Sequence, residues 1–269
     1  MQPRCLRLVA VLACTTAAPV AAQATPRTGV EVLQRMHDAY AGKWYKTLTF
    51  VQKTTVRRRD GTDTVTTWHE SVRYTPAHGT QLRIDIGDLA AGNGVLYTAD
   101  SSWVVRGGKL VAARPNGNEF LPLIEGVYMQ PVARTVKELE SAKIDMQRVS
   151  RGEWQGRQAW IVGASSPSDT TSTQFWIDAE RNVVVRMLLP PGGAGAMLDI
   201  HLDGYVPLAG GWLATKIVMT EGGQPRQSEE YADWKANVAL NDELFLVEKW
   251  STAPHWAKQG TSGTDKGRD

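Results

Sequence analysis

The side chains best suited to catalysis or metal binding lie in one short segment, which contains Asp199, His201 and Asp203. Alternation along a strand would place all three on one face, where carboxylate oxygens and an imidazole nitrogen are donors that a divalent metal accepts. Residues two apart on a strand are separated by about 7 Å, and the intervening Ile200 and Leu202 would face the other way. The spacing therefore also fits the solvated face of a half-buried strand, which is the interpretation we favour.

The other candidate residues form no catalytic pattern. His69 alternates with Trp68 and Val72, as a solvent-facing strand histidine would. The sequence has no Gly-x-Ser-x-Gly elbow, no His-Glu-x-x-His pair and no P-loop lysine, and the glycines within 192–195 follow two prolines. We predict no metal, no cofactor and no enzymatic activity. A hydrolase that uses the face of Asp199 and His201 is the alternative from a different class.

Residues 1–24 have the composition of a secretory signal peptide. A basic start with Arg4 and Arg7 precedes an apolar centre and an Ala-Gln-Ala site at 22–24. The apolar run falls short of the roughly 20 residues that a membrane span requires. We therefore predict an exported, periplasmic protein. The alternative is a lipoprotein signal in which Cys14 becomes acylated and anchors the protein to the outer membrane.

The net charge indicates which binding partners are improbable, and the cysteine content indicates whether disulfides can stabilise the fold. The chain carries 30 basic and 28 acidic residues, and loss of Arg4 and Arg7 with the leader would leave 28 of each. A net charge near zero indicates neither nucleic acid nor an anionic membrane surface as a partner. Both cysteines, Cys5 and Cys14, lie in the leader, so the remaining chain has no disulfide and depends on its core.

Hydrophobic periodicity predicts one helix followed by many strands. Thr28 and Glu31 have the spacing of a capping box, and apolar residues then recur on one helical face over 30–40. From residue 47 the period changes to two, and Asp60-Gly61 indicates a hairpin. Alternation over 81–86 places Leu82, Ile84 and Ile86 opposite Arg83 and Asp85.

The middle and the second half of the chain add a helical insertion and further strands. A short apolar helix is predicted over 121–128 and a more polar one over 133–142. The hairpin 173–188 is apolar on both faces of its strands, so it needs a second cover: a helix of the same chain, a partner or an apolar ligand. In total we predict ten or eleven antiparallel strands. Residues 253–269 are polar and glycine-rich, which predicts a disordered tail after one domain over 25–252.

Large apolar side chains on these strands are the candidates for a binding site. The chain has ten tryptophans, which can fill a core or line a concave pocket beneath the apolar helix. On the second interpretation, ten residues would contact bound lipid: Phe50, Trp68, Ile84, Tyr97, Ile124, Val127, Trp160, Phe175, Trp176 and Ile200.

The order of these parts resembles the LolA/LolB superfamily of periplasmic lipoprotein carriers over about 30–250. The resemblance rests on the first helix V-L-Q-R-M-H-D-A-Y, the hairpin F-W-I-D-A-E-R-N-V-V-V-R and the late L-N-D-E-L-F. It implies an α+β fold that is mainly β, a strongly curved antiparallel sheet or incomplete β-barrel with helices over its concave face. It also implies a carrier without catalysis.

We therefore predict a monomeric carrier that shelters acyl chains and moves a lipid or acylated lipoprotein across the periplasm to the outer membrane. An inner- or outer-membrane protein would be its partner. Shelter for acyl chains gains about 0.8 kcal/mol per buried methylene and needs apolar area more than reactive groups. The alternative is an envelope sensor or interaction module on the same scaffold, which would form a stable complex with a protein partner.

Overall fold

The computed structural model describes residues 25–58, 60–98, 100–115, 117–118, 120–190 and 195–261. The predicted signal peptide with both cysteines and the glycines at 192 and 193 lie outside these ranges, as does the tail beyond 261. Within these ranges no helix is long and apolar enough to cross a membrane.

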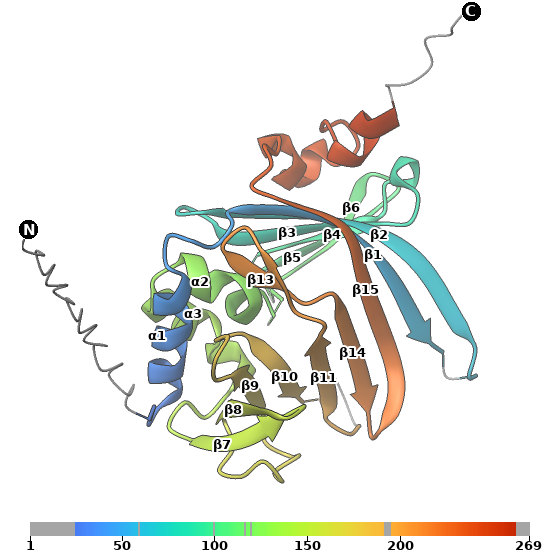
Figure 1. The fold of residues 1–269 in the computed structure, drawn as a ribbon. Coiled ribbons are helices and arrows are strands. Elements are labelled where there is room, and N and C mark those ends of the chain that lie inside the picture. The colour runs from blue at the N-terminus through green and yellow to red at the C-terminus, as the bar shows by residue number, and fades with distance from the viewer. Residues whose placement is uncertain are drawn as a thin grey trace, which may run out of the picture.

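A 13-stranded antiparallel sheet forms most of the molecule, in the order β6-β5-β4-β3-β2-β1-β15-β14-β11-β10-β9-β8-β7 (Figure 1). The two end strands, β6 and β7, do not pair, so the sheet curves without closing into a barrel. A separate hairpin of β12 and β13 completes the strands. Their bounds are β1 Thr47–Arg57, β2 Asp63–Thr75, β3 Gly79–Ile86, β4 Gly94–Tyr97, β5 Ser102–Arg106, β6 Lys109–Arg114, β7 Val149–Trp154, β8 Arg157–Val162, β9 Gln174–Asp178, β10 Val184–Leu189, β11 Leu198–Asp203, β12 Val206–Leu208, β13 Gly211–Leu213, β14 Lys216–Glu221 and β15 Gln224–Ala236.

The curved, mainly β architecture agrees with the prediction, but the number of strands does not. We predicted ten or eleven strands, whereas the main sheet alone has 13. Strand β6 is almost entirely exposed, so its sequence lacks the buried alternation that would reveal it. Neighbouring strands also belong to different sheets, since the region 212–220 is divided between β13 and β14.

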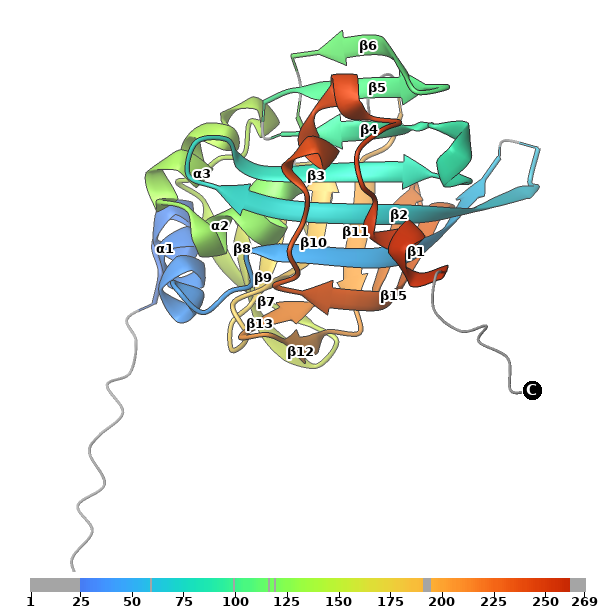
Figure 2. The same ribbon diagram turned by 90° about the horizontal axis from the view of Figure 1, so that it is seen from above.

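Helices α1, α2 and α3 gather at one end of the curved sheet, between its two arms (Figures 1 and 2). Helix α1 begins as the capping box predicts, since the Thr28 side chain accepts a hydrogen bond from the Glu31 amide at 3.2 Å. The predicted apolar helix forms as a π-helical turn, η2, that continues into α2. The helical bounds are α1 Gly29–Tyr40, η1 Leu89–Ala91, η2 Pro122–Gly126, α2 Val127–Met129, α3 Val132–Glu138, η3 Glu140–Ala142, η4 Asp242–Phe245, η5 Val247–Lys249 and η6 Trp256–Thr261.

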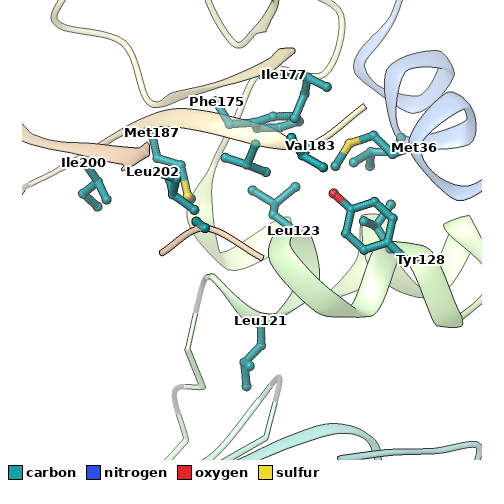
Figure 3. Packing of buried hydrophobic residues seen from close by; sticks show 14 of the residues in the cluster. Met36, Leu121, Leu123, Tyr128, Phe175, Ile177, Val183, Met187, Ile200 and Leu202 are labelled. Carbon is teal, nitrogen blue, oxygen red and sulfur yellow. The ribbon is translucent and has the colours of Figure 1, made fainter. Parts of the chain in front are cut away.

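Segments of the same chain cover both faces of the doubly apolar β9–β10 hairpin. On the inner face Phe175 and Met187 belong to one core with Met36 of α1 and Leu123 of η2 (Figure 3). On the outer face Trp176 packs in a separate cluster, with Ile161 among its members. The same-chain helix is therefore the cover of the inner face, and no ligand is needed there.

The outer face of β3 is covered by residues 242–257, which we call the C-terminal strap (Figure 2, red). Buried Arg83 makes two 2.7 Å hydrogen bonds to Asp85 and donates to the carbonyls of Leu244 and Trp250, each at 3.0 Å. His255 Nε2 lies 3.2 Å from the same carboxylate. The structure thus differs from the predicted disordered tail, since the chain after Trp250 stays packed as far as buried His255.

We expect Arg83→Ala to lower the free energy of unfolding by about 3–5 kcal/mol, because it leaves Asp85 buried without its main partner. Urea denaturation measures this loss. The matched control is Arg57→Ala, which removes an Arg–Asp pair whose side chains are 46% and 41% exposed. The control should lose less than about 1 kcal/mol. Equal losses would show that the buried pair does not anchor the strap.

Candidate functional site

The concave face of the sheet encloses a cavity of about 250 Å³ between strands β1–β4, strands β14 and β15, and the helical insertion. Strand alternation turns every second side chain of β1 inward, so Leu48, Phe50 and Gln52 all line it. The insertion contributes Ile124 and Glu125 to the opposite wall. Most of the lining is apolar or aromatic, as is typical of a small-molecule pocket.

The structure brings five of the ten predicted lipid-binding residues together in this cavity. They come from four strands and the insertion: Phe50, Trp68, Ile84, Tyr97 and Ile124. Four others, Val127, Trp160, Phe175 and Ile200, are buried in the core that includes α1 and the insertion. Trp176 lies on the outer face of the sheet. The division follows the helices, which occupy the inner face over β8–β10 and leave it open over β1–β4.

Several lining residues were missed, although some carried a signal. Leu48 and Gln52 share the parity of Phe50 along β1, and Glu70 shares that of Trp68 along β2, so alternation could have found them. Strand β15 offered no such clue, because the residues around Glu229 are mostly polar. Its inward face is decided by pairing with β1.

Glu125 is a buried carboxyl that links the insertion to the chain before β1. It accepts hydrogen bonds from Trp44 Nε1 at 3.0 Å and from the Tyr45 hydroxyl at 2.8 Å. Burial raises the pKa of Glu125 to about 7, and the two hydrogen bonds oppose that rise. This contact therefore holds the cavity's cover in place with a proton bound at neutral pH or below.

Glu70 and Glu229 place two more buried carboxyls in the cavity wall. Burial raises the pKa of both, and for Glu70 the charge of Glu229 adds to the rise. Glu229 accepts hydrogen bonds from the Tyr231 hydroxyl at 2.6 Å and from Gln227 Nε2 at 2.5 Å. The described lining contains no lysine, arginine or histidine, so the protein supplies no cation to these carboxyls there.

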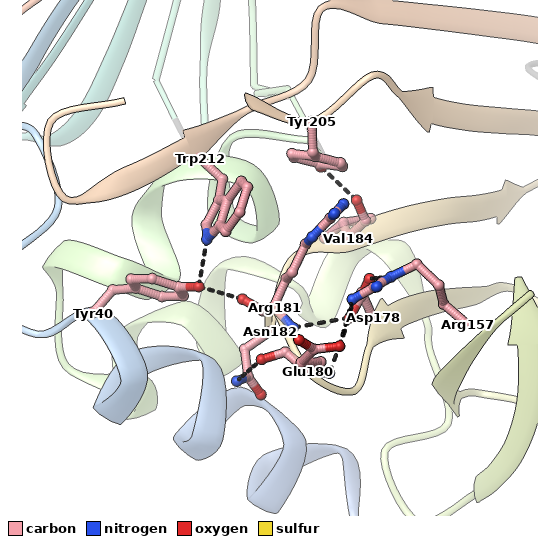
Figure 4. Close-up of polar contacts among 9 residues, drawn as sticks. All are labelled: Tyr40, Arg157, Asp178, Glu180, Arg181, Asn182, Val184, Tyr205 and Trp212. Atoms are coloured by element: carbon pink, nitrogen blue, oxygen red, sulfur yellow. Dashed lines mark hydrogen bonds and ion pairs between the residues drawn. The ribbon is translucent and has the colours of Figure 1, made fainter. Parts of the chain in front are cut away.

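A polar frame joins α1, the β9–β10 turn and β13 next to the cavity (Figure 4). Trp212 Nε1 donates to the Tyr40 hydroxyl at 2.8 Å, and that hydroxyl donates to the Arg181 carbonyl. In the turn, Asp178 is hydrogen-bonded by the Arg157 guanidinium at 2.5 and 3.1 Å. These contacts hold the helical end of the molecule against the sheet.

The segment first considered for metal binding is occupied by ion pairs. Arg186 makes two hydrogen bonds to Asp199, at 2.8 and 2.7 Å, and His201 Nε2 lies 3.0 Å from the same carboxylate. Asp203 accepts instead from Gln155 at 2.7 Å. Among the residues described, no group of three or more histidine, cysteine or acidic side chains is placed to hold a metal ion.

No family model matches the chain, and no curated protein matches its sequence. Solved structures do share the fold. A Vibrio parahaemolyticus domain assigned as an outer membrane lipoprotein-sorting protein has 12% identity and a TM-score of 0.57, over 83% of this chain and 98% of that domain. A DUF1329 family protein from Desulfovibrio piger has 12% identity and a TM-score of 0.54, and the match covers 81% of this chain and 95% of the Desulfovibrio piger chain.

A LolA superfamily protein from Nitrosomonas europaea also matches, with 12% identity and a TM-score of 0.48, over 81% of this chain and 97% of its own. At such identities the likeness concerns the fold alone. The match to the lipoprotein-sorting domain confirms, at the level of the fold, the resemblance drawn from the order of sequence elements.

We expect stability to fall as pH rises from about 4.5 to about 7, because Glu125 keeps its proton in the folded protein up to about pH 7 but has a pKa near 4.5 when unfolded. Its contribution is complete below 4.5 and is lost above 7. Glu125→Gln stays neutral at every pH, so it should remove up to roughly 3 kcal/mol of this dependence. Thermal unfolding between about pH 5 and 8 measures it.

Burial also raises the pKa values of Glu70 and Glu229, but both residues remain in the Glu125→Gln variant. The difference between the variant and the wild type therefore reports on Glu125 alone. Exposed Glu153 provides the control, and Glu153→Gln should follow the wild-type curve. If Glu125→Gln also runs parallel to wild type, Glu125 is not protonated in the folded protein at neutral pH.

Proposed function

We propose that this protein is an exported, non-enzymatic carrier that shelters the acyl part of a lipid or acylated lipoprotein in its concave cavity. The observation that supports this most is the apolar cavity that remains between the curved sheet and the helical insertion. The shared fold with a domain assigned to outer membrane lipoprotein sorting agrees with the proposal. With the leader predicted over 1–24, the carrier would work in the periplasm and deliver to the outer membrane.

The size of the cavity limits the cargo that it holds in the observed shape. Its volume of about 250 Å³ is just below the roughly 300–1,000 Å³ of pockets for drug-sized ligands. It suits one acyl chain better than several. A chain of about ten methylenes would gain roughly 8 kcal/mol from burial, before the costs of ordering the ligand. Such a gain is of the size that reversible transport needs.

Movement of the helical insertion would widen the cavity for the entry and exit of a chain. Ile124 and Tyr128 of the insertion form part of the cavity wall, and Glu125 hydrogen-bonds to Trp44 and Tyr45. Because this contact is polar and local, it can break without loss of the sheet. A larger cargo, with more than one acyl chain, would need the insertion to open.

The test is uptake of an uncharged fluorescent alkyl probe by delipidated protein. Ile84 is 7% exposed and lines the cavity, so Ile84→Trp should fill it and weaken probe binding by about tenfold or more. Val65 of β2 is 57% exposed, and Val65→Trp should leave binding unchanged. Thermal midpoints establish that both variants fold.

If folded Ile84→Trp binds the probe as the wild type does, lipid does not occupy this cavity. If the wild type takes up no probe and yields no lipid on organic extraction, the carrier function itself is wrong. The carrier proposal predicts that both measurements on the wild type are positive.

A further inference from the structure

Two carboxyls face the cavity from the strands on either side of β1. Glu70 of β2 pairs with Phe50, and Glu229 of β15 pairs with Thr54. Gln52 lies between those two positions on β1 and is hydrogen-bonded to Glu229. The side chains of Glu70, Glu229 and Gln52 all line the cavity. Glu70 is 4% exposed and Glu229 is 7% exposed. They therefore form one acidic pair on the concave face.

The two members of the pair differ in their hydrogen bonds. Glu229 is satisfied by Tyr231 and Gln227. Glu70 is just as buried but accepts no hydrogen bond from any residue that the structure describes, and it senses the charge of Glu229. Its carboxyl oxygens are not among the fully buried atoms without a partner, so they keep some exposure, and Glu70 lines the cavity. Glu70 thus lacks a donor on the side that faces the cavity.

The protein does not supply that donor from another wall. No lysine, arginine or histidine occurs in the described lining, and the third carboxyl, Glu125, is already used by Trp44 and Tyr45. A metal ion does not fit either, because the described residues place no third histidine, cysteine or acidic ligand beside the pair. The donor that Glu70 lacks is therefore one that an occupant of the cavity can supply.

We propose that the cavity binds an amphiphile with a primary ammonium head, which Glu70 and Glu229 receive while the apolar walls surround its chain. The inference rests on the proposed carrier function and specifies its ligand class. A primary ammonium carries three donors and a positive charge, so it can donate to both carboxyls and balance the negative charge that they gain when they release their protons. A fatty acid would instead bring a third anion to the same place.

The aromatic side chains beside the pair favour the same ligand. The rings of Phe50 and Tyr231 lie with centroids 5.0 Å apart, and both line the cavity next to the glutamates. Ring faces attract cations, and the attraction is larger where water is excluded. The titratable groups that interact with Glu70 are Glu229, Tyr97 of β4 and Tyr231, and none of the three supplies a positive charge.

Calorimetric titration with four probes tests the ligand class: dodecylamine, dodecanol, dodecanoic acid and spermidine. Delipidated wild-type protein near neutral pH should bind dodecylamine about tenfold or more tightly than dodecanol or dodecanoic acid. Glu70→Gln should lose that preference and keep its affinity for dodecanol. Glu230→Gln is the matched control, since Glu230 is adjacent to Glu229 on β15 and its side chain is 58% exposed.

A measurement on the wild type keeps the proposal testable if Glu70→Gln does not fold. Burial holds protons on the pair, and an ammonium would displace them, so dodecylamine binding should release protons and dodecanol binding should not. Titrations in two buffers with different ionisation enthalpies measure this release.

Equal affinity for dodecylamine and dodecanol, as expected if water satisfies Glu70, overturns the ammonium site and leaves the carrier function intact. An unchanged preference in folded Glu70→Gln overturns it too. If no twelve-carbon probe binds, both proposals fail. If spermidine binds as tightly as dodecylamine, the ammonium site stands but the chain is not sheltered, which contradicts the carrier function.

Discussion

The pairing of β1 with β15 is the contact on which the rest of this structure depends. It joins the first described strand to the last and so unites β1–β6 with β7–β11, β14 and β15 in one continuous sheet. The concave face exists only because the two arms are joined there. The same pairing sets Glu229 and Tyr231 beside Phe50 and Gln52, so it also builds the polar part of the cavity. Such pairing between distant segments forms only after a large loss of chain entropy.

A curved sheet with two apolar faces must be covered on both. In this protein the inner face is covered only in part. The outer face is covered by the C-terminal strap over β3 and by the Trp176 cluster over β8–β10. On the inner face, α1 and the insertion pack against β8–β10 and form the main core (Figure 3). They do not fill the inner face over β1–β4. The cavity is this remainder.

Three buried carboxyls in an apolar cavity oppose stability, because each must keep a proton or lose hydration. Glu125 answers this with two donors from the chain, whereas Glu70 has none among the described residues. Departures of this kind from good packing are expected where a protein binds something. The arrangement separates Glu125, which holds the helical cover, from Glu70 and Glu229, which line the cavity.

The sequence by itself determined the local elements. The cap at Thr28, the hairpin turn at Asp60-Gly61 and the alternation around Ile84 each have a local physical cause, and each occurs as predicted. The periods also showed which residues share a face, which is why Phe50 and Trp68 were found. Tertiary structure alone decided what covers each face. Phe175 and Tyr97 are both aromatic residues on predicted strands. Phe175 is buried in the core that includes α1 and the insertion, whereas Tyr97 lines the cavity.

The same limit explains the residues that sequence reasoning missed or misplaced. Glu229 lies in a polar strand, and only the register with β1 turns it inward. His255 follows a polar, glycine-rich pattern, and only the buried Arg83–Asp85 pair holds it in place. Periodicity reports the direction of a side chain relative to its own strand. Burial depends on what lies opposite, and that is set by contacts between segments far apart in the chain.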